Sequence, residues 1–157
     1  MVVKLARFFR YPAVVKLWFV PVWLALGVAK LAIFTVSFKR LVPRLGVSMG
    51  VSPWLPLLDA HQEQTARWIG QVIQMAARYT PWESNCFPQA VVARLLLGWY
   101  RIPYGVFFGV CRDPLTADFR AHAWVGSGRV RVTGGFGFSR YVVVGVFVAP
   151  QLLHNWE

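Results

Sequence analysis

The sequence predicts an α+β fold in which helices precede an antiparallel sheet, and three observations support this prediction. Before Pro103, apolar residues recur at helical spacing. After Pro103, the pattern changes to aromatic and β-branched runs that are typical of strands. Gly126-Ser127-Gly128 separates two of these runs, as a tight hairpin would. The chain has 157 residues, 57% hydrophobic and 15% charged. This composition fits one packed domain with at most one appended segment, and it excludes a disordered protein.

The first 45 residues form a basic, apolar segment that is expected to be helical. No acidic residue precedes Asp59, so most of the formal charge of +11 lies at the front of the chain. The uncharged run Leu17–Ala29 is shorter than the roughly 20 apolar residues of a membrane span. Basic and aromatic residues interleaved with aliphatic ones favour a segment that lies in a membrane interface or docks on a partner protein. Two alternatives are a span over residues 11–38 and a cleaved signal peptide.

The positive charge does not indicate a nucleic acid partner. The cations are embedded in aliphatic sequence rather than in a polar basic face, and no nucleic-acid-binding motif is present. Two cysteines exclude a disulfide scaffold and a four-cysteine zinc module. We therefore expect no nucleic acid, no metal and no bound cofactor.

Two helices are predicted between the basic segment and the strands, and the first follows a linker. The segment Gly46–Pro56 contains glycine, serine and proline and is interpreted as that linker. Asp59 is expected to cap the first helix, with Gln62 completing a capping box. This helix should end near Tyr79, because Pro81 disfavours helical backbone in the residue before it.

The second predicted helix starts near Ser84 or Asn85 and is buried. Pro88 is tolerated there because it falls in the first turn, where its missing N–H would be unpaired in any case. Gly98 and Pro103 bracket the end of this helix. The strands that follow are expected at Tyr104–Cys111, His122–Val125, Arg129–Thr133 and Tyr141–Val148.

Cys86 and His122 are the candidates for catalysis. Cys86 falls in the first turn of the second helix, where unpaired amides and the positive helix end favour a thiolate and could bind an oxyanion. His122 lies on an apolar strand, where it is either a core histidine or the general base that pairs with Cys86. A cysteine on a helix followed by a histidine on a strand is the chain order of papain-like folds. Cys111, His61 and His154 lack such a context and are weaker candidates.

The residues around both candidates resemble a known family. Residues 78–90 read RYTPWESNCFPQA, Ala121–Val125 reads AHAWV, and Val132–Gly135 reads VTGG. Together and in this order they resemble the stand-alone B protein of lasso-peptide biosynthesis, the maturation peptidase of that pathway. The resemblance extends over nearly the whole chain, including the Leu- and Arg-rich N-terminus.

This resemblance implies a transglutaminase-like cysteine peptidase domain at residues 46–149, preceded by the segment 1–45 and followed by a tail, 150–157. It implies removal of the leader from a ribosomally made precursor peptide, followed by ring closure by a partner cyclase that uses ATP. It further implies a separate leader-binding protein and a pocket for a threonine at the penultimate leader position. The expected location is the cytoplasm, either free or at the inner face of the cell membrane.

One position departs from the family pattern. Family members often carry an aspartate twelve residues after the histidine, but here that position is Gly134. The group that orients His122 could then be Asp118, a backbone carbonyl, a residue of a partner, or none. Gln89 is a candidate oxyanion donor or helix-capping group. The missing aspartate also favours an alternative, a non-catalytic scaffold that holds precursor and cyclase together.

Overall fold

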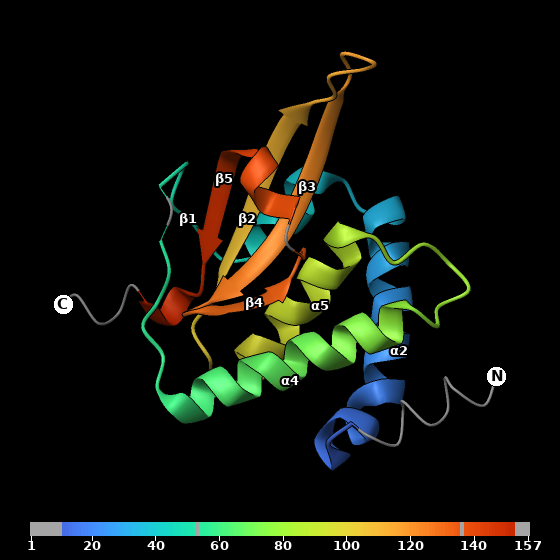
Figure 1. Ribbon diagram of the computed structural model, residues 1–157, viewed down its shortest axis with the longest axis vertical. Coiled ribbons are helices and arrows are strands. Elements are labelled where there is room, and N and C mark those ends of the chain that lie inside the picture. Colours follow the sequence, from blue (N-terminus) through green and yellow to red (C-terminus); the bar gives the residue numbers. More distant parts are fainter. Residues whose placement is uncertain (1–10, 53, 136, 153–157) are drawn as a thin grey trace.

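The computed structural model describes residues 11–152, except residues 53 and 136, and it confirms the α+β prediction. Helices precede a five-stranded antiparallel sheet, and an apolar helix lies near the N-terminus (Figure 1). Most of the predicted tail 150–157, including His154, lies outside the described residues.

The described helices form two layers on one face of the sheet. Helices α4 and α5 pack on strands β3 and β4, and α2 covers α4 and α5 from the side away from the sheet (Figure 1). The α-helices are α2 (Ala13–Thr35), α3 (Phe38–Leu41), α4 (Ala60–Ala77) and α5 (Cys86–Trp99). Short 3₁₀ turns occupy Val42–Arg44, Gly137–Arg140 and Pro150–Leu152.

Both predicted helices are present with the expected starts. Asp59 caps α4: its carboxylate accepts the N–H of Gln62 at 2.8 Å, and the Gln62 side chain accepts the N–H of Asp59 at 3.2 Å. This is the capping box that the sequence predicted. Helix α4 ends at Ala77, slightly before the predicted end. Asn85 is the N-cap residue of α5, so Cys86 is the first residue of that helix.

The sheet has the strand order β1-β5-β2-β3-β4, with all neighbours antiparallel. Its strands are β1 (Val47–Ser48), β2 (Gly105–Arg112), β3 (Phe119–Ser127), β4 (Val130–Thr133) and β5 (Val142–Val148). Strand β1 falls in the segment predicted to be a linker. It pairs with the end of β5, and two residues are too few to show a strand period in the sequence. The hairpin turn also lies later than predicted, because β3 continues through Ser127.

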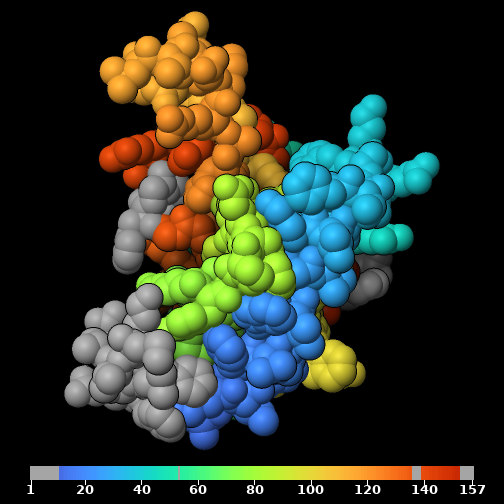
Figure 2. Space-filling view, turned by 90° about the vertical axis from the view of Figure 1, so that its right-hand side faces the viewer, coloured from blue at the N-terminus to red at the C-terminus, as the bar shows by residue number. Residues whose placement is uncertain are grey.

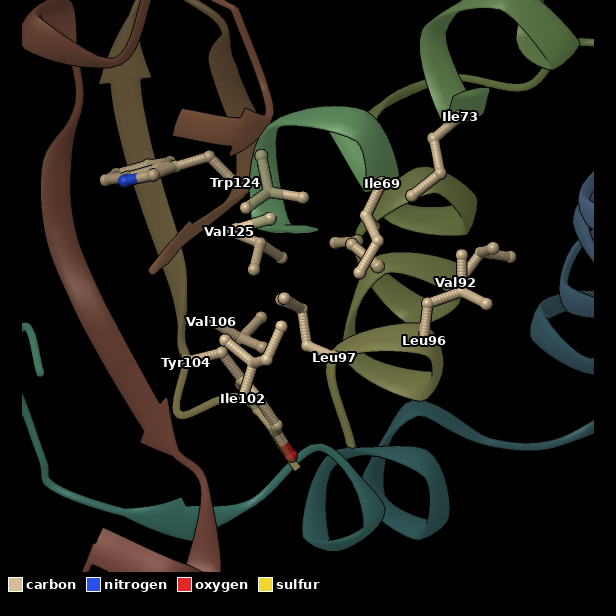
Figure 3. Close-up of a cluster of buried hydrophobic side chains, with 14 of the residues drawn as sticks. Ile69, Ile73, Val92, Leu96, Leu97, Ile102, Tyr104, Val106, Trp124 and Val125 are labelled. Atoms are coloured by element: carbon tan, nitrogen blue, oxygen red, sulfur yellow. The ribbon is translucent and has the colours of Figure 1, made fainter. Parts of the chain in front are cut away.

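The core fills the space between α4, α5 and the sheet. Figure 3 shows Ile69 of α4 and Leu97 of α5 pointing toward Val125 of β3. These three side chains are completely buried. Trp124, the neighbour of Val125, points away from the helices, as alternation along a strand requires (Figure 3). Helix α2 joins the same core through Val15, Val22, Leu26 and Ala29.

A buried tyrosine fixes the chain that precedes β1. Tyr104 is 1% exposed, and its hydroxyl donates a hydrogen bond of 3.0 Å to the carbonyl oxygen of Leu45. Tyr104→Phe removes this bond and leaves a buried acceptor unpaired, so the free energy of unfolding should fall by about 1–2 kcal/mol. Urea denaturation measures this loss. Tyr79→Phe is the matched control, because Tyr79 is 46% exposed, and its unfolding midpoint should stay near that of the parent protein.

Candidate active site

The segment before α5, residues 78–85, sets the position of Cys86. Thr80 Oγ1 lies 2.9 Å from the carbonyl oxygen of Trp82 and 2.9 Å from Oγ of Ser84. The side-chain amide of Gln89, one turn into the helix, donates to the carbonyl oxygen of Ser84 at 2.7 Å. Thr80 and Ser84 thus brace the segment internally, and Gln89 ties it to α5.

Helix α2 holds the same segment from the outside. The indole N–H of Trp23 donates to the carbonyl oxygen of Tyr79 at 3.1 Å, and the rings of Trp23 and Trp82 lie 4.8 Å apart. Gly27 allows this close approach: a Cβ there would lie 2.9 Å from the Trp82 ring. The apolar N-terminal helix is therefore in direct contact with the backbone that presents Cys86.

This contact gives a testable prediction. Trp23→Phe keeps an aromatic ring against Trp82 but removes the bond to the Tyr79 carbonyl. We expect a loss of about 1 kcal/mol in the free energy of unfolding, together with altered alkylation kinetics of Cys86, measured by mass spectrometry with iodoacetamide. Trp99→Phe, at a position 77% exposed on α5, is the control and should change neither quantity.

His122 lies in the middle of β3, opposite Gly109 of β2. Its Nε2 is 2.8 Å from the carbonyl oxygen of Gly134. Because a carbonyl oxygen can only accept, Nε2 carries the hydrogen in this contact, and Nδ1 of the neutral ring is left with its lone pair. The Tyr141 ring stacks on the imidazole at 4.9 Å and the Trp124 ring lies at 5.9 Å. The imidazole is thus fixed in one plane with one nitrogen ready to accept a proton.

Gly134 stands where the family pattern has aspartate, and the backbone there excludes any side chain. Its φ is +92°, a region that favours glycine. A Cβ built on it would lie 2.2 Å from Cβ of Trp124. The same backbone conformation turns the Gly134 carbonyl toward His122. Of the alternatives for the orienting group, the structure therefore shows a hydrogen bond to a backbone carbonyl.

Cys86, His122 and Gln89 line one cleft of about 510 Å³. Its other lining residues come from α4 and the segment after it and from the end of β4: Gln74, Ala77, Arg78, Ser84, Gly134 and Gly135. No acidic side chain is among the described residues that line this cleft. Asn85 makes no side-chain capping bond, so it does not use the first amides of α5. These amides and the guanidinium of Arg78 give the cleft a positive character suited to a thiolate or an oxyanion.

Of the two weaker candidates, Asp118 lies outside the cleft that Cys86 and His122 line, whereas Gln89 lines it. Asp118 is exposed and lies in the connection between β2 and β3, where its carbonyl accepts the N–H of Asp113. It does not line the cleft, so the structure does not bring it to His122. Gln89 lines the cleft, and its observed contact is the one that braces Ser84. A role for Gln89 in binding an oxyanion stays a prediction.

Tyr141 is a site residue that the sequence reasoning missed. Its half-buried ring covers one face of His122. Burial, followed by the nearby Cys111 thiol, raises the pKa of its hydroxyl above the ordinary value. The hydroxyl is therefore protonated at neutral pH. The contact of Tyr141 with His122 depends on strand β2 lying between β3 and β5. This strand order cannot be predicted from local sequence periodicity, so no pattern identifies Tyr141.

The comparisons with known proteins give one match. The model of the transglutaminase-like superfamily matches residues 32–145, which include Cys86, His122 and Gly134. Members of this superfamily are typically cysteine hydrolases or transferases. Neither curated proteins nor solved structures give a match. Because the match covers more than half of the chain and includes both catalytic candidates, the chain belongs to the transglutaminase-like superfamily.

Proposed function

We propose that the protein is a cysteine peptidase that removes the leader from a ribosomally made lasso precursor peptide, before a partner cyclase closes the ring. The observation that carries the proposal is the cleft that contains both Cys86 and His122, with Nε2 of His122 held by the Gly134 carbonyl. The choice of substrate rests on the sequence resemblance of Arg78–Ala90 and Ala121–Val125 to the lasso B proteins.

In the first step, the Cys86 thiolate attacks the carbonyl carbon of the bond between leader and core. The negative charge that develops on the carbonyl oxygen is stabilised by the first amides of α5, with the positive helix end behind them. His122, which has taken the thiol proton on Nδ1, donates that proton to the leaving amine of the core peptide. The C–N bond breaks, and the leader stays attached to Cys86 as a thioester.

In the second step, water attacks the thioester and His122 accepts its proton. The C–S bond breaks, the leader leaves with a free carboxylate, and the Cys86 thiolate returns. The Gly134 carbonyl keeps the hydrogen on Nε2 throughout, so Nδ1 is the atom that carries protons between the thiol, the leaving amine and water. The enzyme itself needs no cofactor, and ATP belongs to the partner cyclase.

The test is mass spectrometry of a synthetic precursor, the short peptide encoded next to this protein, after incubation with the purified chain. We propose that a separate leader-binding protein recruits the precursor, so the assay is run with and without that protein. Cleavage at one bond by the parent protein, absent for Cys86→Ala, is the expected result. Full cleavage by Cys86→Ala would contradict the proposal.

The second candidate function is a non-catalytic scaffold of the same fold that holds precursor and cyclase together. The lack of an acidic side chain among the described residues lining the cleft favours it. Alkylation by iodoacetamide near pH 6 separates the two functions. A peptidase should show Cys86 reacting much faster than Cys111, whereas equal and slow reaction of both thiols would indicate the scaffold.

A further inference from the structure

The outward face of α2 is an apolar surface that nothing in the described chain covers. Its residues, which we call the outer stripe, follow one another at spacings of three and four positions and are Leu17, Val20, Leu24, Val28, Leu31 and Phe34. Their exposed fractions reach 76% at Leu17 and 75% at Phe34. Figure 2 shows α2 lying open on this face, beside the green segment that precedes α5. At 1.5 Å per residue, the helix is about 35 Å long.

We propose that the outer stripe lies on the surface of a membrane that contains anionic lipid. The stripe itself carries no hydrogen-bonding side chain, whereas a typical protein interface combines apolar contact with several hydrogen bonds. Lys16 and Lys30 lie beside it, and Lys39, Arg40 and Arg44 follow within the next turns. No acidic residue precedes Asp59. The charged residues of the segment that carries the stripe are thus all cations, and an apolar face flanked by cations along the chain matches lipid chains below anionic headgroups.

The charge pattern argues against a second copy of this chain as the occupant. Two outer stripes packed together would place lysines of one α2 near lysines of the other, without an acidic residue from either segment between them. On a lipid surface, the same lysines extend along the helix toward the headgroups. Lys30 already lies along the helix in this way, with Nζ 5.0 Å from the centre of the Phe34 ring.

The contacts of the inward face of α2 place the helix on the membrane rather than across it. By length and composition alone, α2 could cross a bilayer. However, its inward face is packed on α4 and α5, with Val22 and Leu26 buried, and Trp23 donates to the Tyr79 carbonyl. A span would bring the polar outer side chains of α4, Arg67 among them, into hydrocarbon. A helix with protein on one side and lipid on the other satisfies both faces.

The experiment is flotation of the full chain with vesicles, either of phosphatidylcholine alone or with about one third phosphatidylglycerol. We expect binding roughly tenfold stronger or more with the anionic lipid. Leu24→Gln/Val28→Gln should reduce that binding at least about tenfold. Both side chains point outward, so circular dichroism and the alkylation rate of Cys86 should not change.

The matched control is Leu115→Gln/Phe119→Gln, which exchanges two exposed apolar side chains: Leu115 in the connection between β2 and β3 is 93% exposed, and Phe119, the first residue of β3, is 78% exposed. This variant should bind anionic vesicles like the parent protein. Three results would overturn the proposal: no flotation, equal flotation of the Leu24→Gln/Val28→Gln variant, or a dimer in light scattering that this variant dissociates. Retention in the membrane after carbonate extraction would overturn the peripheral placement, because it indicates a span.

Discussion

Replacing His122 by alanine should lower the rate of leader cleavage roughly 10³-fold or more, because in the proposed mechanism this residue carries the proton in both chemical steps. Cys86 remains in place, but its thiol has lost the neighbouring base. The same variant should therefore also slow the alkylation of Cys86 near pH 6. The first effect is measured by mass spectrometry of the precursor, and the second by the rate of labelling with iodoacetamide.

His61→Ala is the matched control for this prediction. His61 lies in the first turn of α4, is exposed and does not line the cleft. Cleavage and labelling rates of this variant should equal those of the parent protein. If His122→Ala cleaved at the parent rate, His122 would be a core histidine, and the proposed chemistry would be wrong.

Restoring the aspartate of the family pattern at position 134 should damage the protein rather than improve it. Gly134→Asp forces a side chain onto a residue with φ of +92° and places its Cβ against Trp124. Backbone strain and steric overlap together should cost about 3 kcal/mol of unfolding free energy. The displaced carbonyl would no longer hold Nε2 of His122, so cleavage should also fall. Urea denaturation and the precursor assay measure the two effects.

Gly135→Asp separates strain from overlap. Gly135 also has a positive φ, +62°, but a Cβ there meets no atom within 4 Å. An aspartate tolerates this conformation, so the expected loss in unfolding free energy is about 1 kcal/mol. The opposite result would be a Gly134→Asp variant that is as stable as Gly135→Asp and more active than the parent protein. In that case position 134 accommodates the aspartate, and the backbone carbonyl is not the group that orients His122.

The sequence predicted those parts of the fold that depend on local signals. The capping box consists of Asp59 and Gln62, and the start of α5 at Asn85 is indicated by Pro88 in the first turn, so each signal lies within four residues along the chain. Strand β1 was missed because it forms only by pairing with β5, whose residues follow about one hundred positions later in the chain. The local periodicity of a sequence does not predict contacts between segments that are this far apart.

The candidate site shows the same division. Cys86 was identified from its place at a helix start, and His122 from its strand and from the resemblance. Helix α2 was predicted as an appended segment, but Trp23 and Gly27 contact the residues that position Cys86. Tyr141 was missed as well. The contacts of Trp23 and of Tyr141 both join segments that are distant in the sequence. The position of either residue in its local sequence pattern does not indicate such a contact.

The hydrogen bond between His122 and the carbonyl of Gly134 has a consequence for experiments that substitute one side chain at a time. Its acceptor is a peptide oxygen, which every amino acid possesses, so a substitution at residue 134 can displace the acceptor through the backbone but cannot remove it. Under the proposed mechanism, a survey of essential side chains would identify Cys86 and His122 and would not identify the backbone carbonyl of residue 134 as the group that orients His122. Chemical synthesis with an altered main-chain linkage after residue 134 would reveal it.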